Sequence, residues 1–327
     1  MRAVTIRDTV LSVEEHPDPV PGQGEVLVRV AAAGMNGADL MQRAGYYPAP
    51  PGSPPDIPGL EFSGRVEVNG PGAERFKVGD AVMAIVGGGA QAELVVVHER
   101  VLMAVPERVE LISAGGIPEV FTTAHDAIFT QAGLNSGERL LVHGAAGGVG
   151  SAAVQLGRMT GARVTATVRR AEHHEAVASL GADVITPEQF SATATLGRTD
   201  PAALAAIGGP FDVILELIGA PNLPDDLDAL SVGGRIAVIG IGAGAKAELN
   251  LRVLMNKRAR ICASTLRSRP LEEKALTARA LERGVLPGFA SGALHVPVAQ
   301  TFPLADAPAA YEAFAAGGKL GKLLLLP

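Results

Sequence analysis

A chain of 327 residues is longer than most single compact domains, so we expect two domains. Hydrophobic residues account for 47% of the sequence and charged residues for 19%, which excludes a disordered chain and favours large packed cores. The net charge of −6 leaves no basic excess to neutralise phosphates, so nucleic acid is not an expected partner.

The N-terminal residues MRAVTIRD are typical of a strand and lack the apolar core of a signal peptide. No apolar run approaches the roughly 18 residues that span a bilayer, so no membrane partner is expected. Cys262 is the single cysteine, which excludes an intramolecular disulfide and fits a reducing compartment. We therefore expect a cytoplasmic protein.

The first third of the chain is predicted to form short strands. Apolar runs at residues 24–34, 79–86 and 92–99 have the length of strands and are separated by turn residues. Residues 45–59, GYYPAPPGSPPDIPG, are rich in proline and glycine and are predicted to be a loop. Strands that follow one another without long helices predict a barrel or a sandwich.

From about residue 119, strands and helices are predicted to alternate. Gly161 and Gly181 end the first two helices, as glycine commonly does. This alternation predicts an α/β domain with a parallel, doubly wound sheet. The predicted strands are 139–144, 162–168, 211–219, 233–240 and 259–265, and the helices are 148–161 and 171–182. The tail is mixed, with helices at 270–284 and 305–317 and strands at 295–302 and 321–326.

The first of these strands passes into its helix through the stretch VHGAAGGVG, residues 142–150. The pattern is A-x-G-x-x-G, with Ala145 in the slot that is glycine in the strict dinucleotide fingerprint. Glycines at a strand–turn–helix junction let the backbone approach a pyrophosphate, and the helix N-terminus supplies N–H donors. The alternative is a tight turn without a ligand. The flanking strand and helix, and the next strand at the right distance, favour a cofactor site.

The end of the next strand discriminates between the two nicotinamide cofactors. NAD-binding proteins usually carry an acidic residue about 20 residues after the glycines, to hold the ribose 2′-hydroxyl. Here Val168 is followed by Arg169 and Arg170, and no acidic residue is present. Arginine binds phosphate bidentately, so the pair indicates the 2′-phosphate of NADPH. The alternative is that both arginines are solvated loop charges.

The chain resembles the medium-chain dehydrogenase/reductase superfamily and, within it, the zinc-free NADPH quinone oxidoreductases. The resemblance runs nearly end to end, through AAAGMNGADLMQRAGYYPAPPG, IPGLEFSGRVEVNG, VGDAVMAIVGGGAQAELVVV, IPEVFTTAHDAIF, VHGAAGGVGSAAVQLG and STLRSRP. It implies a doubly wound Rossmann domain inserted into a chaperonin-10-like β-barrel domain. On this basis we expect the barrel-like catalytic domain at 1–118 plus 288–327 and the dinucleotide-binding domain at 119–287.

The resemblance also indicates which positions of this chain correspond to the zinc ligands of related alcohol dehydrogenases. Asn36 stands where the first cysteine ligand is expected, and Leu60 where the histidine is expected. The third region, PEVFTT, contains no cysteine, and one cysteine cannot build a four-cysteine structural site. We interpret His98 and His143 as structural histidines. A metal-free hydride transfer to a quinone is therefore expected, with no Lewis acid in the site.

Asn36 and Tyr47 are the catalytic residues that the resemblance implies, both lining the acceptor pocket. Asn36 would hydrogen-bond a carbonyl oxygen, and Tyr47 would do so or donate a proton, although a phenol with a pKa near 10 is a modest acid. The alternatives are that Tyr47 only covers the cleft, or that its neighbour Tyr46 takes the role. The protein's main contribution would be to position nicotinamide against acceptor.

The resemblance also implies cofactor contacts along the chain, with Arg169 and Arg170 as the phosphate ligands. Two departures from the family pattern, Thr186-Pro187 in place of an Asn-Tyr pair and His173 in place of a lysine, place more weight on these arginines. Ordinary turns and interface packing are the alternatives for the later glycines and for Leu266. The remaining expected cofactor residues are Thr123, Gly147, Gly148, Val149, Gly240, Gly242, Leu266 and Lys322.

Three functions fit these residues. The first is an NADPH-dependent quinone oxidoreductase that acts on a small-molecule acceptor. The second is a reductase of α,β-unsaturated carbonyls, such as an alkenal or an enoyl thioester, and the third is a non-catalytic NADPH-binding protein. The apolar strand predicted within 259–265 would be an exposed edge unless it is paired, so we expect a homodimer. The identity of the acceptor, and one- or two-electron reduction, stay open.

Overall fold

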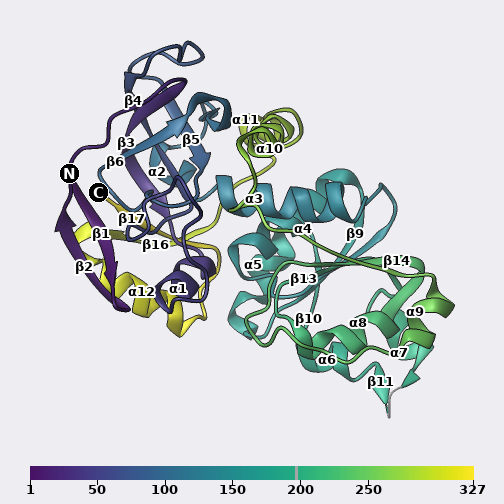
Figure 1. Ribbon diagram of the computed structural model, residues 1–327. Coiled ribbons are helices and arrows are strands. Elements are labelled where there is room, and N and C mark those ends of the chain that lie inside the picture. Colours follow the sequence, from purple (N-terminus) through teal and green to yellow (C-terminus); the bar gives the residue numbers. More distant parts are fainter. Residues whose placement is uncertain (196–197) are drawn as a thin grey trace. The chain divides into compact units, whose positions relative to one another are not determined.

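Figure 1 shows the computed structural model, which describes residues 1–195 and 198–327. The chain divides into two compact units, the first made of Met1–Thr122 and Leu266–Pro327 and the second of Thr123–Thr265. The second unit is thus inserted into the first. The chain re-enters the first unit at Leu266, about twenty residues before the boundary expected from the sequence, so helix α10 (Leu271–Gly284) belongs to the first unit.

The first unit is built on a seven-stranded sheet with the order β16-β17-β3-β4-β5-β7, in which β6 also pairs with β3. The C-terminal strand β17 pairs with β3 through Leu324 and Gly34, which brings the end of the chain beside residues 34–36. A separate hairpin joins β1 (Arg2–Arg7) to β2 (Val10–Glu15). The sheet strands are β3 (Glu25–Gly34), β4 (Glu61–Asn69), β5 (Ala81–Ile85), β6 (Leu94–His98), β7 (Met103–Ala104), β16 (Val298–Pro303) and β17 (Lys322–Leu326).

Valine and alanine on β3 and its neighbours form one buried core, as expected where β-branched side chains pack on a pleated surface. A second core lies under α12 (Ala307–Ala316), where the fully buried Tyr311 packs with Val4, Met35 and Leu323. The other helical segments of this unit are α1 (Gly37–Arg43), η1 (Glu99–Val101), α2 (Leu111–Ala114), α3 (Pro118–His125, which crosses into the second unit), α11 (Leu286–Ser291) and η5 (Leu304–Asp306).

The second unit contains a six-stranded sheet with the order β10-β9-β8-β13-β14-β15, and every neighbouring pair is parallel. The strand order runs outward in both directions from β8 and β13, which is the doubly wound arrangement. Ligands of such sheets bind outside the carboxyl ends of the strands at this switch point. The strands are β8 (Arg139–Val142), β9 (Arg163–Thr167), β10 (Asp183–Ile185), β13 (Phe211–Glu216), β14 (Leu230–Val238) and β15 (Arg260–Ala263).

The segments that connect these strands are mostly helical (Figure 1). The first helix, α4 (Gly148–Thr160), ends at Gly161, which has a φ of 85° and so adopts the left-handed conformation that glycine tolerates. No helix among residues 1–195 and 198–327 is long and apolar enough to cross a membrane. The remaining segments are η2 (Asp126–Gln131), η3 (Ala171–His173), α5 (His174–Ser179), α6 (Pro187–Ser191), β11 (Ala194–Thr195), β12 (Arg198–Thr199), α7 (Pro201–Ala206), η4 (Ala220–Asn222), α8 (Leu223–Ala229) and α9 (Leu251–Lys257).

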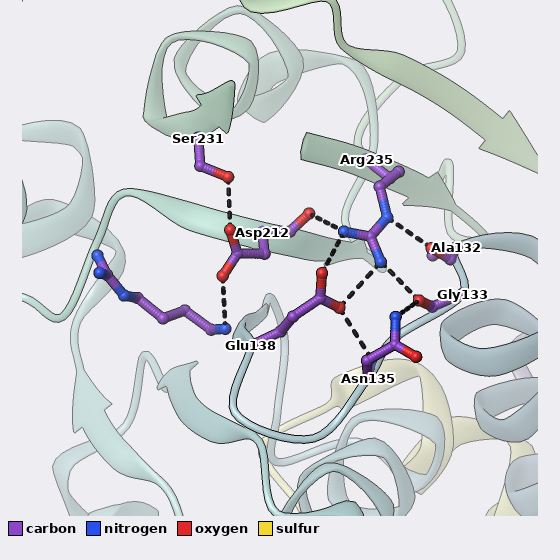
Figure 2. A network of polar contacts seen from close by, with 8 residues as sticks. Ala132, Gly133, Asn135, Glu138, Asp212, Ser231 and Arg235 are labelled. Carbon is purple, nitrogen blue, oxygen red and sulfur yellow. Dashed lines mark hydrogen bonds and ion pairs between the residues drawn. The ribbon is translucent and has the colours of Figure 1, made fainter. Parts of the chain in front are cut away.

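A buried arginine stabilises the amino edge of the parallel sheet, opposite the edge where ligands are expected. Figure 2 shows Arg235 of β14 donating two hydrogen bonds to Glu138, at 2.8 and 2.9 Å, and others to the carbonyls of Ala132 and Gly133, both at 2.6 Å. The pair with Arg235 lowers the pKa of Glu138. Because a bidentate arginine–carboxylate pair fixes geometry, this network anchors η2 to the base of β8.

Candidate functional site

The N-terminus of α4 presents backbone donors to a possible anion. Gly147 is the extended N-cap residue and has no side chain to cap the helix, and it is exposed, with Gly148 and Val149 partly exposed. At Gly150, a Cβ atom would lie 2.6 Å from both the Ala145 Cα and the Gly144 carbonyl oxygen, so only glycine fits there. No side chain at the N-cap occupies the first-turn N–H groups, as a pyrophosphate site requires.

The glycine turn is hydrogen-bonded to the end of β9. The N–H groups of Gly144 and Ala145 donate to Oγ1 and to the carbonyl oxygen of Thr167, both at 3.2 Å. Arg169 and Arg170 follow within three residues and are exposed. Arg170 forms an ion pair with Glu172 at 3.3 Å, whereas none of the described ion pairs involves Arg169. The positive charge expected from the sequence therefore lies at the same sheet edge as the glycine turn.

The other expected residues of the second unit lie in different surroundings. Gly240 follows β14, and a Cβ there would lie 2.0 Å from the carbonyl oxygen of Leu217, so loop packing alone requires this glycine. Gly242 is exposed, and a Cβ there would meet no atom within 4 Å. Thr123 is buried on α3, 8% exposed, as the first residue of the second unit.

In the first unit, Asn36 caps α1, and its side-chain amide is fully engaged. Its Nδ2 donates to the Gly34 carbonyl at 3.2 Å and to Glu61 Oε1 at 3.0 Å, and its Oδ1 accepts from Lys322 Nζ at 2.7 Å. Both N–H bonds of the amide are therefore used. Asn36 has no free donor for a substrate carbonyl, which is the role that the resemblance implies for it.

Lys322 is buried, 2% exposed, and its ammonium has three close acceptors. These are the Met35 carbonyl at 2.6 Å, Asn36 Oδ1 at 2.7 Å and Glu61 Oε1 at 2.6 Å. Since an ammonium carries three donors, a direct contact of Lys322 with a cofactor would require one of these bonds to break. Sequence reasoning missed Glu61, the completely buried partner, because the strand that carries it, β4, was not among the predicted strands.

Tyr47 is held by Arg267, a buried arginine of the segment that follows Leu266. Arg267 donates from Nη1 to the Tyr47 carbonyl at 2.7 Å, and its guanidinium lies over the Tyr47 ring, with Cζ 5.0 Å from the centroid. Partial burial raises the pKa of the Tyr47 hydroxyl. The Glu119 charge adds to this effect, whereas the Arg267 charge opposes it. None of the described hydrogen bonds involves this hydroxyl, whereas its neighbour Tyr46 is 80% exposed.

A surface pocket of about 370 Å³ opens beside this loop in the first unit. Basic side chains from Arg267 and Lys274 line it, and burial lowers the pKa of Lys274, assisted by the Arg267 charge. Leu266 is 7% exposed and lines a smaller neighbouring cavity, so its observed role is packing. The larger pocket is lined by residues 50–54, 85–88, 96–98 and 267–271, and by Glu25, Val101 and Lys274.

The two positions that hold zinc ligands in related alcohol dehydrogenases do not fit a metal ion here. Leu60 is apolar and 2% exposed, and the buried Lys322 ammonium lies within hydrogen-bonding distance of Asn36. A cation at Asn36 would be repelled by this ammonium at short range. Among the described residues, one cluster of potential metal ligands is found, formed by His143, Glu216 and Asp226 in the second unit.

Comparisons with known proteins agree with this architecture. A family model for the alcohol dehydrogenase GroES-like domain matches residues 22–107, and one for zinc-binding dehydrogenases matches residues 148–282. The quinone oxidoreductases of Rattus norvegicus and Homo sapiens are both 32% identical over 311 residues, covering 94% of this chain and 91% of theirs. The structure of an alcohol dehydrogenase superfamily protein from Novosphingobium aromaticivorans superimposes with a TM-score of 0.86 at 27% identity, covering 100% of this chain and 99% of that one. The chain is therefore a member of the medium-chain dehydrogenase/reductase superfamily, an oxidoreductase of the quinone oxidoreductase type.

Proposed function

We propose that this protein is an NADPH-dependent oxidoreductase that transfers hydride to a quinone without zinc. The observation that carries the proposal is the uncapped N-terminus of α4 with the exposed Arg169 beyond the adjoining strand. An open helix N-terminus suits a pyrophosphate, and an exposed guanidinium that takes part in none of the described ion pairs suits a 2′-phosphate. The 32% identity to quinone oxidoreductases supports the choice of acceptor.

When bound, the cofactor supplies the hydride, and a proton completes the reduction of a quinone to a hydroquinone. The first-turn N–H groups of α4 orient the pyrophosphate, and Arg169 and Arg170 bind the 2′-phosphate. Tyr47, like any phenol, keeps its proton at neutral pH, and its raised pKa extends this to higher pH, so its hydroxyl donates a hydrogen bond to the acceptor oxygen. Asn36 acts through Lys322 and Glu61, holding the start of α1 in place.

The absence of a metal requirement is part of the proposal. A quinone is already electron-poor, so the anion formed by hydride addition needs less stabilisation than an alkoxide does. The apolar Leu60 and the ammonium of Lys322 support this, because neither accommodates a divalent cation. Cys262, the single cysteine, fits a reducing compartment, and we keep the cytoplasm as the proposed location.

One observation favours a second candidate, reduction of an α,β-unsaturated thioester. The loop at 45–59 contains no lysine or arginine, but the fold adds Arg267 and Lys274 to the pocket beside it. Basic groups at a pocket are what an anionic carrier such as a phosphorylated thioester would need. A neutral quinone offers no negative charge for these groups to bind.

A substrate panel separates these functions. The intact protein is assayed for NADPH oxidation with 1,2-naphthoquinone, an alkenal and a coenzyme A enoyl thioester, each also without enzyme. We expect the highest kcat/KM with the quinone and no change in it for Lys274→Gln. A preference for the thioester that Lys274→Gln abolishes would establish the second candidate. NADPH binding without oxidation in any assay would leave only a binding protein.

A further inference from the structure

Three titratable side chains are buried together at the carboxyl edge of the parallel sheet. His143 follows β8, Glu216 ends β13 and Asp226 lies on α8, and none is more than 2% exposed. One ligand atom from each lies within 4.8 Å of the others. Charged groups are rarely buried to this extent unless they are paired, so the cluster requires an explanation.

The imidazole of His143 connects two elements. Its Nε2 lies 2.8 Å from Asp226 Oδ1, and its Nδ1 lies 3.2 Å from Thr167 Oγ1. Thr167 Oγ1 already accepts from the N–H of Gly144, so its own proton is available for Nδ1. In the neutral ring this arrangement favours a proton on Nε2, donated to Asp226. Burial lowers the pKa of His143, but the charges of Asp226 and Glu216 and the hydrogen bond to Asp226 outweigh it, so the pKa is raised overall. The glycine turn, β9 and α8 are thereby joined through one ring.

Glu216 holds the next loops in the same way. Its carboxylate accepts from the backbone N–H groups of Ile218 and Gly219, the latter at 2.7 Å, and from Asn222 Nδ2 at 3.0 Å. Its carbonyl oxygen accepts from the N–H of Gly240 at 3.1 Å. One residue therefore anchors the loop after β13 and the loop after β14, both at the edge where a cofactor is proposed to bind.

Asp226 has one oxygen left over. Its Oδ2 is buried and has no hydrogen-bond partner among the described residues. A proton on Oδ2 would give it a donor for Glu216 and would remove the repulsion between two buried carboxylates. Burial raises the pKa of Asp226 to about 7. The interaction with His143 opposes this effect, and the interaction with Glu216 adds to it.

A metal ion is the competing occupant, and the contacts disfavour it. His143 Nε2 and Asp226 Oδ1 are at hydrogen-bonding distance, which leaves no space for an ion between them. Both oxygens of Glu216 already accept from N–H donors, which a cation would have to displace. The contacts therefore fit a hydrogen-bonded cluster better than a metal site.

We propose that His143, Glu216 and Asp226 share a proton that positions the loops of the cofactor edge, so that NADPH affinity depends on the protonation of this cluster. The inference rests on the proposed function, because it assigns this edge to the cofactor. Loss of the proton adds negative charge near the proposed site of the cofactor phosphates. It also creates repulsion between the carboxylates of Asp226 and Glu216, which loosens both anchored loops. These three are positioning residues, since none is assigned a contact with the reacting atoms.

The surroundings add little competing charge. The ring of Phe190, on α6, packs against the His143 ring, with 4.8 Å between the centroids, and Thr167 of β9 hydrogen-bonds to Nδ1. Neither residue is charged. Asp225 and Asp228 lie on α8 itself, and burial raises the pKa of both. Asp225 therefore supplies a matched control on the same helix.

The test measures the Kd of NADPH for the intact protein by cofactor fluorescence between about pH 6 and pH 8.5. We expect the wild-type affinity to fall about tenfold over this range. Asp226→Asn keeps the shape and both hydrogen bonds, with an amide donor that cannot ionise, so its affinity should change less than about twofold once the slope common to all variants is subtracted. Asp225→Asn should keep the wild-type slope, and any slope due to the 2′-phosphate itself appears in all variants.

The outcomes are distinguishable. If the wild type binds NADPH and its affinity has the same pH slope as that of Asp226→Asn, the inference is overturned and the proposed function stays intact. A lower Tm for Asp226→Asn with an unchanged slope assigns the cluster a purely structural role and also overturns it. Stoichiometric zinc that is lost in Asp226→Asn would make the cluster a metal site instead. No NADPH binding by the folded wild type at any pH overturns the proposed function, and this inference with it.

Discussion

Arg267 holds Tyr47 by two contacts at once, a hydrogen bond of 2.7 Å to its carbonyl oxygen and a stacking contact of 5.0 Å with its ring. The same guanidinium donates to the Gly87 carbonyl at 2.8 Å and to Gln42 Oε1 at 2.5 Å. A planar fork of donors is needed to reach all three acceptors, and lysine does not provide one. Arg267 therefore fixes the loop that carries the proposed hydrogen-bond donor.

Replacing Arg267 by lysine should loosen this loop. We expect Arg267→Lys to reduce kcat/KM for the quinone by about 10- to 100-fold, because about two charge-assisted hydrogen bonds are lost. The KM for NADPH should change little, since the arginine's contacts all lie in the first unit. Steady-state kinetics with both substrates varied measures this. Arg269→Lys, two residues away and with a side chain that is 16% exposed, should keep wild-type kinetics, and equal losses in the two variants would contradict the assignment.

Tyr47→Phe removes only the hydroxyl. If Tyr47 donates a hydrogen bond to the acceptor, kcat should fall by about tenfold or more, whereas Tyr46→Phe should be neutral. The raised pKa also predicts the pH profile: the protonated form is retained as pH rises, so kcat should not decline through ionisation of Tyr47 below about pH 10. Wild-type kcat in Tyr47→Phe would show that this residue only covers the pocket.

The metal prediction follows from Leu60 and Lys322. Purified protein should contain no stoichiometric zinc, and dialysis against a chelator should leave quinone reduction unchanged. Elemental analysis and a chelator titration check this. One tightly bound zinc per chain, with activity lost on its removal, would exclude the zinc-free assignment.

Strand β15 is an edge of the parallel sheet and pairs with β14 alone among the described strands. Its Ile261 is 36% exposed, and an apolar edge strand is a surface that proteins usually cover. We predict a two-fold dimer formed through this edge, which Ile261→Lys should dissociate at low concentration. Light scattering gives the mass, and Leu276→Lys, at a position of α10 that is 67% exposed, serves as control. A wild-type monomer at every concentration would refute the dimer.

The doubly wound sheet was predictable because its signals are local. The glycine-rich turn, Gly161 at the end of α4 and the apolar strand at β13 each follow from neighbouring residues, and the structure confirms them. Strand ends moved by a few residues, as at β9, which ends at Thr167 instead of Val168.

The networks were not predictable in the same way. Lys322 meets Asn36 across 286 residues of sequence, and His143 meets Asp226 across 83, so no local pattern reveals either pair. Only the fold brings them together: β17 pairs with β3, and α8 packs near the end of β8. Asn36 shows the consequence, since sequence reasoning assigned its amide to the acceptor and the structure shows that amide occupied by Gly34 and Glu61.

The ratio of kcat/KM for NADPH to that for NADH tests the central claim most directly. Each charge-assisted hydrogen bond to the 2′-phosphate is worth about 1.5–3 kcal/mol, roughly ten- to hundred-fold in affinity. The account predicts a preference for NADPH of at least about tenfold, which falls in Arg169→Ala and further in the double variant with Arg170→Ala, while NADH use is nearly unchanged. Equal use of both cofactors by the wild type, or equal impairment of both by the arginine substitutions, would contradict it.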